Sequence, residues 1–418
     1  MILSYYWPPA GGSGVQRWMY FAKYLKQFGW EPIVLTVDEN QASYATLDHS
    51  LLEEVKDVRV IKTSTREPLK WYSRLTSGSS NAGIPQGEVN TTSFFGKCAA
   101  YIRGNFFIPD ARKGWAPFAV KAAKKLLQEE SIQHLITTGP PHSTHLAGLQ
   151  LSKTYQLNWW VDFRDPWTSV FYNNQLFRTK RSEAKDEALE RQVLNAASGV
   201  ITTVGGRLVE RLKAIAPQQS FTVLPNGYDA ALVDAVQGKK DKDYFHVVYT
   251  GLLTKNQAYA QLIQVLKQLQ GERPIRFSLA GNIALSIINE IKNALPEVEV
   301  VHHGYLAHQA AIGLMKSGDL LLNFIFDGAQ TEMISGKLLE YFTTEVPVLS
   351  IGDPSSAAGE FIAQGSCARM FKPSQEKEIF TFLNELYAAK HSPRNAFPQL
   401  QDWTREAICK QLIDEVLT

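Results

Sequence analysis

Strand-like and helix-like segments alternate along most of this chain. "ILSYYW" is strand-like, "GVQRWMYFAKYLKQFG" has apolar residues at helical spacing and ends at Gly29, and "EPIVLTV" is strand-like again. "HLITT", "NWWVDF" and "GVITTV" continue the series, with a helix expected from about Ser143. Because the connections are short, this alternation predicts a parallel, doubly wound sheet.

The alternation stops once and then restarts. After "VLPNGYDA" the chain becomes polar in "VQGKKDKDY", and the strand-like segments "FHVVYTG", "IRFSLAG", "VEVVHHG", "DLLLNFI" and "VPVLSIG" follow with helical segments between them. A chain of 418 residues is also too long for one ordinary core. The sequence therefore predicts two Rossmann-like halves that meet near residues 220–245.

Composition excludes several classes of protein. The net charge of +2 gives no global field for nucleic acid. The cysteines Cys98, Cys367 and Cys409 lie far apart without metal-type spacing, as in a reducing cytosol. No apolar run approaches the ~20 residues of a bilayer span, and "MILSYYWPP" is no signal peptide. We expect a cytoplasmic protein that binds no nucleic acid.

One region departs from this pattern. Residues 76–93, "TSGSSNAGIPQGEVNTTS", are too long for an ordinary connection and predict a mobile loop. Between residues 65 and 125 there are ten Lys and Arg against three Asp and Glu, with "FF" pairs at 94–95 and 106–107. A solvated surface with buried aromatic residues is one interpretation. The other is a face that contacts an anionic membrane.

The first loop, "PPAGGSGVQR", places Gly11, Gly12 and Gly14 between a strand and a helix. It fails as a dinucleotide fingerprint because Arg17 stands where a third glycine belongs, although Asp38 at the end of the next strand keeps a dehydrogenase open. Such a loop supplies N–H groups at a helix start, which can hold an anion.

The stretch "TEMISGKLLEYFTTEVPVL", residues 331–349, carries more specific chemistry. Ser335 is a candidate N-cap for a helix over 336–344, whose free N–H groups would lie beside Lys337 and form a diphosphate site. Glu332 and Glu340 would flank that site, and carboxylates accept hydrogen bonds from sugar hydroxyls. The alternative is that Glu340 only pairs with Lys337 at i, i+3 on an exposed face.

The whole chain resembles a known family. Two glutamates separated by seven residues and followed by "VPVL" are similar to the signature of the family-four retaining glycosyltransferases of the GT-B fold. "SYYWPPAGGSGVQR", "TTGPPHSTHLAG" and "VDFRDPWT" resemble amino-terminal loops of its polysaccharide-cluster branch. "GVITTVGGRLVERL", "VLPNGYD", "VVYTGLLTKNQ", "FSLAGN" and "HHGYLAHQAAIGLMKSGDLLL" resemble later segments in the expected order.

This resemblance implies an architecture and a reaction. Two Rossmann-like domains would face each other across a cleft: an acceptor-side domain at 1–224 with a return helix at 402–418, and a donor domain at 225–401. A sugar would move with retention from a nucleotide diphosphate donor, without metal or other cofactor, to a glycan or lipid-linked acceptor in surface polysaccharide synthesis. We expect the inner face of the membrane as the place of action; the sequence does not indicate an oligomeric state.

The resemblance also assigns residues. Lys255 and Lys337 would neutralise the diphosphate, Glu340 would hold the ribose and Glu332 the donor sugar. Gly281 and Asn282 would lie near the base, beside the Gly304–Tyr305 turn. Further contacts to the donor are expected from Gly12, Gly14, Gly251, Asn282, Tyr305, Ser335 and Gly336.

On the acceptor side, His142 would substitute for a histidine that many members place near the donor sugar, whereas His145 is expected to be structural. Arg164 and Asp165 would contact the acceptor or form a buried ion pair at a strand end. Two positions depart from the family pattern: Leu252 replaces an arginine, and Gln257 stands where a basic residue is common.

Three other functions stay open. A nucleotide-sugar epimerase shares the fold and the donor, and would epimerise the donor without acceptor. An inactive relative would bind nucleotide without turnover, which Leu252 and Gln257 would explain. An NAD-dependent dehydrogenase would be stabilised by a nicotinamide cofactor.

Overall fold

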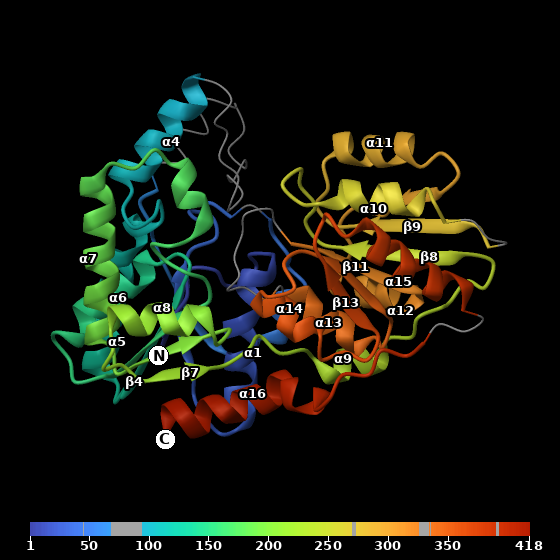
Figure 1. Cartoon of the computed structure of the whole chain (residues 1–418). Helices are drawn as coiled ribbons and strands as arrows, with labels where there is room; N and C mark the ends of the chain where they lie inside the picture. The colour runs from blue at the N-terminus through green and yellow to red at the C-terminus, as the bar shows by residue number, and fades with distance from the viewer. Residues whose placement is uncertain (45, 68–93, 270–272, 326–333, 335, 390–392) are drawn as a thin grey trace. The chain divides into compact units, whose positions relative to one another are not determined.

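The computed structural model describes residues 1–44, 46–67, 94–269, 273–325, 334, 336–389 and 393–418 (Figure 1). The predicted loop at 76–93 and the residues Glu332 and Ser335 lie outside these ranges. The chain forms two compact units, Met1–Asn226 with Arg405–Thr418, and Gly227–Thr404. No helix in the described part of the chain is both long and apolar enough to cross a bilayer.

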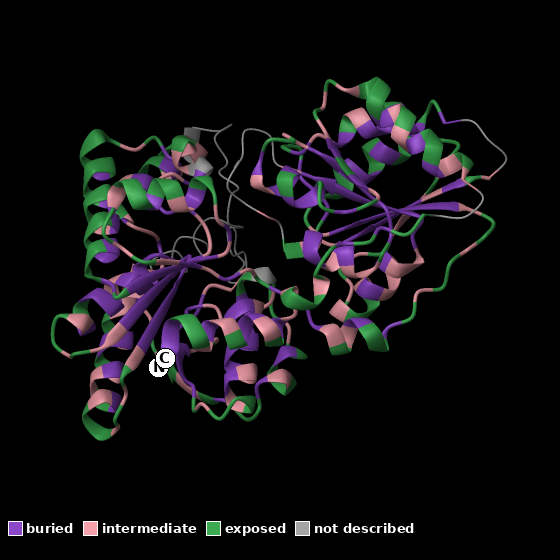
Figure 2. Ribbon diagram, turned by 60° about the horizontal axis from the view of Figure 1, so that its bottom comes forward, coloured by how far each residue is buried: buried purple, intermediate pink, exposed green. Residues whose placement is uncertain are grey.

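The first unit is built on a parallel sheet in the order β3-β2-β1-β4-β5-β6-β7. The strands are β1 (Ile2–Leu3), β2 (Ile33–Val37), β3 (Arg59–Thr63), β4 (His134–Gly139), β5 (Asn158–Phe163), β6 (Gly199–Thr202) and β7 (Phe221–Val223). Strands β1, β2 and β6 are buried along their whole length, and β4 and β5 are buried after their first residue (Figure 2). The order reverses between β1 and β4, which is where ligands bind in doubly wound sheets.

Helices pack against this sheet. They are α1 (Ser13–Gln27), α2 (Leu51–Glu54), α4 (Phe94–Phe106), α5 (Ala116–Glu129), α6 (Ser143–Ser152), α7 (Lys180–Ala196) and α8 (Arg207–Ile215), with 3₁₀ turns at Lys113–Trp115 and Phe171–Gln175. The expected helix starting at Ser143 is present as α6.

The first strand is shorter than its apolar content predicted. The strand expected over "ILSYYW" ends at Leu3; the N–H of Ser4 still donates to the carbonyl of Leu35 on β2 at 3.0 Å, and its hydroxyl donates locally to the carbonyl of Tyr6 at 2.9 Å. Pro8 and Pro9 follow and have no N–H to offer a neighbouring strand. Tyr5 and Trp7 are nevertheless buried. Their apolar side chains therefore indicate packing in the core and not hydrogen-bonded pairing of a strand.

The chain ends with a helix on the first unit, as the sequence predicted. It comprises α16 (Arg405–Leu412) and a π-helical turn at Ile413–Leu417. Ile408, Cys409 and Leu412 share a core with α1, and the Arg405 guanidinium lies 3.6 Å from the centroid of the Tyr20 ring. In Figure 1, α16 runs beside α1.

A buried ion pair lies at the centre of the first unit. Arg17 on α1 donates to the carboxylate of Asp162 on β5 at 2.9–3.2 Å, and both side chains are almost fully buried. Trp18 and Thr138 also donate to Asp162, at 2.6 and 2.7 Å. Arg17 further donates to the carbonyl of Leu224, 2.7 Å away. The network therefore ties α1, β4 and β5 to the segment that leaves β7.

The second unit repeats the parallel design in the order β10-β9-β8-β11-β12-β13. Its strands are β8 (Phe245–Thr250), β9 (Ile275–Ala280), β10 (Glu299–His302), β11 (Leu320–Phe324), β12 (Val348–Ile351) and β13 (Ala368–Phe371). Its helices are α9 (Ala230–Ala235), α10 (Tyr259–Leu266), α11 (Leu285–Ala294), α12 (His308–Ser317), α13 (Gly336–Thr343), α14 (Ala357–Ile362) and α15 (Glu376–Ala388), with a 3₁₀ turn at Leu400–Trp403. The order here reverses between β8 and β11.

The buried pair gives a stability prediction. Asp162→Asn leaves the Arg17 charge buried without its counter-charge and should lower the free energy of unfolding by about 3–5 kcal/mol. As a control, Glu31→Gln breaks the exposed Lys26–Glu31 pair and should cost less than about 1 kcal/mol. Urea unfolding followed by tryptophan emission reports on the first unit, which holds eight of the nine tryptophans. An equal loss of unfolding free energy in the two variants would show that the Arg17–Asp162 pair contributes no more to stability than an exposed pair.

Candidate functional site

Three glycines close the carboxyl edge of the second sheet. Gly251, Gly281 and Gly304 follow β8, β9 and β10, with φ angles of +119°, +125° and +67°. A Cβ on Gly281 would lie 2.2 Å from the carbonyl oxygen of Gly251, so no side chain fits there. The N–H of Gly281 donates to the carbonyl of Gly304 at 2.7 Å. The three strand ends thus meet tightly and leave their outer edge bare of side chains.

Helix α13 is fixed to this edge by Tyr341. The buried Tyr341 hydroxyl accepts from the N–H of Thr250 on β8 at 3.1 Å and donates to the carbonyl of Leu322 on β11 at 3.0 Å. These strands flank the point where the strand order reverses. The N-terminus of α13 therefore stands where a ligand is expected in such a sheet.

Lys337, in the first turn of α13, is a cation without a counter-charge. Its Nζ lies 4.1 Å from the centroid of the Tyr249 ring and would be 3.7 Å from a Cβ on Gly251. No carboxylate of the described residues forms an ion pair with it. Burial lowers the pKa of Lys337 to about 7. A partly desolvated cation beside a helix N-terminus is suited to a phosphate.

Glu340 has a partner other than Lys337. One oxygen of its carboxylate lies 2.7 Å from Nε2 of His308, at the start of α12. The exposed Lys337–Glu340 pair considered as an alternative is therefore wrong. The second carboxylate oxygen has no hydrogen-bond partner among the described residues and can accept from a ligand.

The other predicted donor residues lie along the same edge. Lys255 and Asn282 are exposed, and Tyr305 is 62% exposed after the Gly304 turn. The hydrogen bond from Gly281 to Gly304 brings the Gly281–Asn282 and Gly304–Tyr305 turns together, as the sequence predicted. Gly336 begins α13, and a Cβ there would meet nothing within 4 Å.

The two departures from the family pattern differ in their surroundings. Leu252 is 41% exposed at the edge where an arginine would stand. Gln257 is buried, accepts from the N–H of Thr254 at 2.8 Å and donates to the carbonyl of Phe324 at 3.0 Å. Gln257 therefore fixes the end of β11 to the loop after β8, and only Leu252 alters the charge of the exposed edge. In the described part of the chain, no three His, Cys, Asp or Glu side chains are grouped as metal ligands.

In the first unit, Arg164 joins three loops at the carboxyl edge of the sheet. Its guanidinium donates to the carbonyls of Gly139, at 3.1 Å, and of Gly14 and Pro140. An ion pair with Asp165 was one of the two interpretations of these residues, and it is absent because the guanidinium of Arg164 donates to these carbonyls instead. Asp165 has no hydrogen-bond partner among the described residues, and burial raises the pKa of its carboxyl group.

The glycine-rich loop is not arranged for a dinucleotide. Gly12 precedes α1 with a φ of +95°, and Gly14 lies against Arg164. Arg17, at the third glycine position, points into the core toward Asp162. The Asp38 carboxylate accepts from the backbone N–H of Asn40 and from two side-chain amides in its own turn. These contacts weigh against the dehydrogenase.

His142 and His145 face one glycine. Nδ1 of His142 and Nε2 of His145 are buried and have no hydrogen-bond partner among the described residues, and a Cβ on Gly139 would lie 2.7 and 2.6 Å from them. His145 is fully buried and shares a hydrogen bond with Thr137, as expected of a structural residue. The His142 ring stacks on Trp167 at 5.0 Å. Burial lowers the pKa of His142 well below its usual value, so its ring is neutral at neutral pH.

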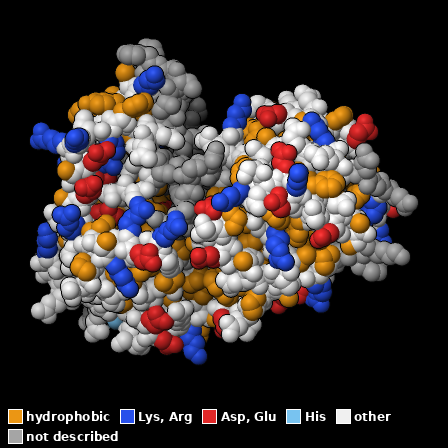
Figure 3. Space-filling model, viewed as in Figure 1, with side chains coloured by type: hydrophobic (Ala, Val, Ile, Leu, Met, Phe, Trp, Pro, Cys, Tyr) orange, Lys and Arg blue, Asp and Glu red, His pale blue; other side chains and the backbone are white. Residues whose placement is uncertain are grey.

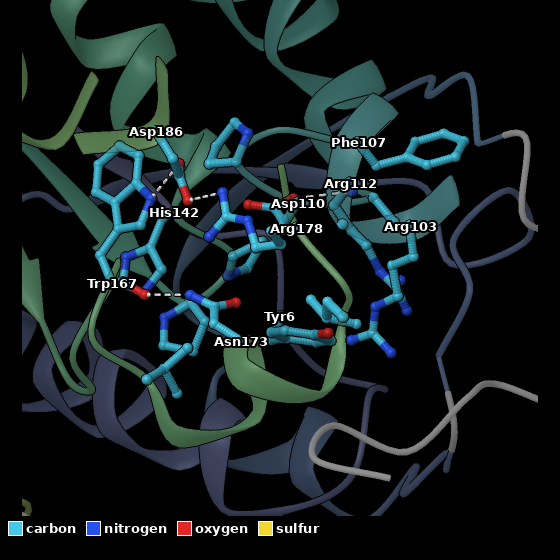
Figure 4. A pocket seen from close by; sticks show the side chains of 17 residues that line it. Tyr6, Arg103, Phe107, Asp110, Arg112, His142, Trp167, Asn173, Arg178 and Asp186 are labelled. Carbon is cyan, nitrogen blue, oxygen red and sulfur yellow. Dashed lines mark hydrogen bonds and ion pairs between the residues drawn. The ribbon is translucent and has the colours of Figure 1, made fainter. Parts of the chain in front are cut away.

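His142 also lines a pocket at this edge of the first sheet (Figure 4). The pocket has a volume of about 80 Å³. Its polar and aromatic lining consists of Tyr6, Arg103, Phe107, Asp110, Arg112, His142, Trp167, Asn173, Arg178 and Asp186. Asp186 accepts from Trp167 Nε1 at 2.8 Å and from Arg178 at 2.7 Å.

Sequence reasoning missed most of this pocket. Asp186 and Glu190 lie in "KRSEAKDEALERQ", whose charge density is typical of a solvated helix face. In the structure both are buried, four residues apart on the inner face of α7. That spacing is the one signal that could have grouped them, but it does not show that the face is turned inward.

Comparison with protein-family models and with curated protein sequences gives no match. Solved structures do match. Sucrose-phosphate synthase from Thermosynechococcus elongatus superimposes with a TM-score of 0.66 at 14% identity, over 99% of this chain and 96% of that one. The chain has the GT-B fold. Anabaena HepE in complex with UDP and glucose gives 0.61 at 14% identity (99% and 98% covered), and the lipopolysaccharide outer core galactosyltransferase WaaB gives 0.56 at 12% (100% and 99%).

The glycine edge gives a second prediction. In Gly281→Ala the new Cβ meets the Gly251 carbonyl and the backbone keeps a positive φ, so the second unit should lose at least about 1–3 kcal/mol. Gly313→Ala on α12 is the matched control; its Cβ would lie 3.5 Å from Val236, and it should add about 0.5–1 kcal/mol. Amide hydrogen exchange over residues 245–324 would measure both. Equal protection of these amides from exchange in the two variants would contradict the tight packing of the strand ends.

Proposed function

We propose that this chain is a retaining glycosyltransferase that moves a sugar from a nucleotide diphosphate to a glycan or lipid-linked acceptor. The observation that carries the proposal is Lys337, a cation that has no carboxylate partner among the described residues and lies beside the glycine edge of the second sheet. Glu340, one turn further on α13, keeps one carboxylate oxygen for a ligand. A diphosphate joined to a ribose matches this pair of groups.

The residues of the second unit would act on the leaving group. When the bond between the sugar and the β-phosphate breaks, its electron pair moves to the phosphate oxygen. Lys337, Lys255 and the N–H groups of α13 neutralise this growing charge, and fixed charges placed in advance lower the barrier. Glu340 accepts from the ribose hydroxyls, and Glu332 is assigned to the donor sugar. The acceptor hydroxyl oxygen then bonds to the same face of the sugar as its O–H bond breaks, and the proton passes to the departing phosphate oxygen.

Other features bear on the choice of donor and on turnover. HepE is described in complex with UDP-glucose, and the Escherichia coli trehalose-6-phosphate enzyme with UDP-2-fluoro glucose, so a uridine nucleotide is the first donor to test. Because Leu252 stands where the family pattern has an arginine, this edge carries one positive charge fewer than that pattern. This favours a second candidate function, a relative that binds nucleotide without turnover. Release of UDP in the presence of acceptor separates the two.

Titration with uridine, UDP and UDP-glucose tests the proposed roles. Lys337→Ala should weaken both diphosphates by about 1.5–3 kcal/mol and leave uridine unchanged, because it removes a charged partner of the phosphate alone. Glu340→Gln should weaken all three ligands, since each contains the ribose. Lys292→Ala, on the exposed face of α11, is the control and should change nothing. Isothermal calorimetry supplies the dissociation constants.

Two results would contradict the assignment. Wild-type affinity for UDP in both Lys337→Ala and Glu340→Gln would move the donor site elsewhere. Weakened uridine binding in Lys337→Ala would mean that the lysine acts on the shape of the site rather than on the phosphate.

We also infer that the first unit contacts an anionic membrane through an apolar patch formed by Tyr101, Ile102, Phe106 and Phe177. These side chains are 44–66% exposed. Phe177 has a positive φ of +46°, and its carbonyl accepts from the amide of Asn105 on α4 at 3.1 Å.

The patch has basic neighbours. Lys97 and Arg103 lie on the same helix, and Lys113 Nζ donates to the carbonyl of Phe106 at 2.7 Å. Hydrophobic and basic side chains lie side by side over α4 in Figure 3. Aromatic anchors beside cations suit an anionic bilayer surface.

Vesicle co-sedimentation tests this contact. Phe106→Ser should lower partitioning onto phosphatidylserine-containing vesicles about tenfold, because one exposed aromatic ring no longer enters the interface. Leu285→Ser removes a 71% exposed side chain from α11 in the second unit and should have no effect. Salt should weaken the binding of the wild type. If vesicle binding does not depend on Phe106, on lipid charge or on salt, the proposed membrane contact is wrong and the surface is an ordinary solvated one.

A further inference from the structure

The pocket of Figure 4 offers hydrogen-bond donors rather than acceptors, because its carboxylates are already occupied. Asp110 accepts from the N–H and hydroxyl of Ser143, at 2.7 and 2.8 Å, and from the N–H of Arg112 at 2.8 Å. Asp186 accepts from Trp167 and Arg178. Burial raises the pKa of both carboxyl groups.

Arg112 and Arg178 retain unused hydrogen-bond donors in the pocket. The side chain of Arg178 is 5% exposed, and among the described residues its Nε has no partner. One of its terminal nitrogens donates to Asp186 and to the carbonyl of Ser182, and no donation by the other is seen in this part of the chain. Arg112 donates through one nitrogen to the carbonyl of Ser43 at 3.2 Å, and its buried Nε likewise has no partner among the residues that the structure describes. A guanidinium has five N–H donors, so both arginines retain unused ones.

The arginines differ in their ion pairs. Arg103, Arg112 and Arg178 line the pocket, and Arg112 forms no ion pair with a carboxylate of the described residues. Glu67 acts on Arg112 electrostatically but forms no ion pair with it, and its own carboxylate accepts from Tyr5 and Thr65. A ligand with several acceptor oxygens and more than one negative charge would satisfy these groups, as a phosphate does.

We propose that this pocket binds the phosphate of a lipid-linked, phosphorylated acceptor. The proposal rests on the glycosyl transfer inferred above and names the class of its acceptor. The lipid part follows from the chain itself, because the pocket and the apolar patch share the same segments. Arg103 and Phe107 line the pocket, whereas Ile102 and Phe106 are exposed beside them on α4.

The second shared segment repeats this arrangement. Leu176 and Arg178 line the pocket, and Phe177 between them is exposed in the patch. Asn105 joins the two segments, since its amide donates to the carbonyl of Phe177 and its oxygen accepts from the N–H of Thr179 at 2.8 Å. A lipid tail in the bilayer would therefore enter beside the patch, while its phosphate reaches the arginines.

Binding of decyl phosphate below its micelle concentration tests the proposal, with inorganic phosphate and decanol as the partial probes. UDP is kept at saturation so that the donor-site lysines do not bind the probe. We expect the whole chain to bind decyl phosphate at least about tenfold more tightly than either partial probe. Arg112→Gln and Arg178→Gln should each weaken it about tenfold or more, since each removes a charged donor.

Arg181→Gln is the matched control, because Arg181 is exposed on α7, and it should bind like the wild type. Thermal melting verifies that each variant folds; if Arg178→Gln does not fold, Arg112→Gln decides, and Arg112→Lys should restore part of the binding. UDP affinity should be unchanged in all these variants, which separates failure of this proposal from failure of the donor site.

Three results would overturn the inference. Decyl phosphate binding that is unchanged in Arg112→Gln would place the phosphate elsewhere. Inorganic phosphate that binds as tightly as decyl phosphate, and depends on the same arginines, would indicate a soluble phosphorylated acceptor. Decanol that binds as tightly as decyl phosphate would leave only an apolar site.

Discussion

The ion pair of Arg17 and Asp162 is the interaction on which the first unit depends most. The carboxylate of Asp162 accepts hydrogen bonds from side chains on α1 and β4. Arg17 also donates to the carbonyls after β7. Because a buried charge is costly unless it is paired, these elements can pack in only one way. Two residues after Asp162, the guanidinium of Arg164 holds the loops after β1 and β4 together. The buried pair therefore sets the carboxyl edge that carries the pocket.

In the second unit, the carboxyl edge of the sheet is positioned by the uncharged side chain of Tyr341 and by tight turns at glycines. Tyr341 ties α13 to β8 and β11, and the glycines after β8 and β9 remove the side chains that would cover the edge. Lys337 is then held over the ring of Tyr249, and no carboxylate in the described part of the chain pairs with it. In both units the functional groups lie where the strand order reverses, but in the first unit they are arginines and in the second a lysine and a glutamate.

Much of this could be predicted from the sequence, because alternation and composition are properties of the whole chain. The two parallel sheets followed from apolar periodicity, the helix start beside Lys337 from a Ser-Gly pair, and the return helix from the resemblance to the family. Contacts between distant residues could not be predicted in this way. The partner of Glu340 is His308, 32 residues away, rather than the neighbouring lysine. Arg164 bonds to carbonyls rather than to Asp165, because backbone acceptors from two other loops meet it.

The first strand and the pocket show a second limit. The segment "ILSYYW" indicated a strand, but Tyr5 and Trp7 are buried outside the sheet. Charged residues on α7 indicated solvent, but Asp186 and Glu190 point inward. Composition reports that a residue is apolar or charged, whereas burial depends on what packs over it. The arginines of the pocket therefore became a candidate site only once α4, α7 and the loop after β5 were seen together.

The central claim is that Lys337 stays partly neutral until a diphosphate arrives. Its pKa is about 7 in the free protein, lowered by burial, so at pH 8 most of it carries no charge. A bound diphosphate favours the charged form, and binding should then take up close to one proton at pH 8 and far less at pH 6. Calorimetric titration of UDP in buffers of different ionisation enthalpy measures this uptake. We predict that it disappears in Lys337→Met and that UDP affinity of the wild type falls as pH rises above 7. The same uptake at pH 8 in wild type and Lys337→Met would contradict the account.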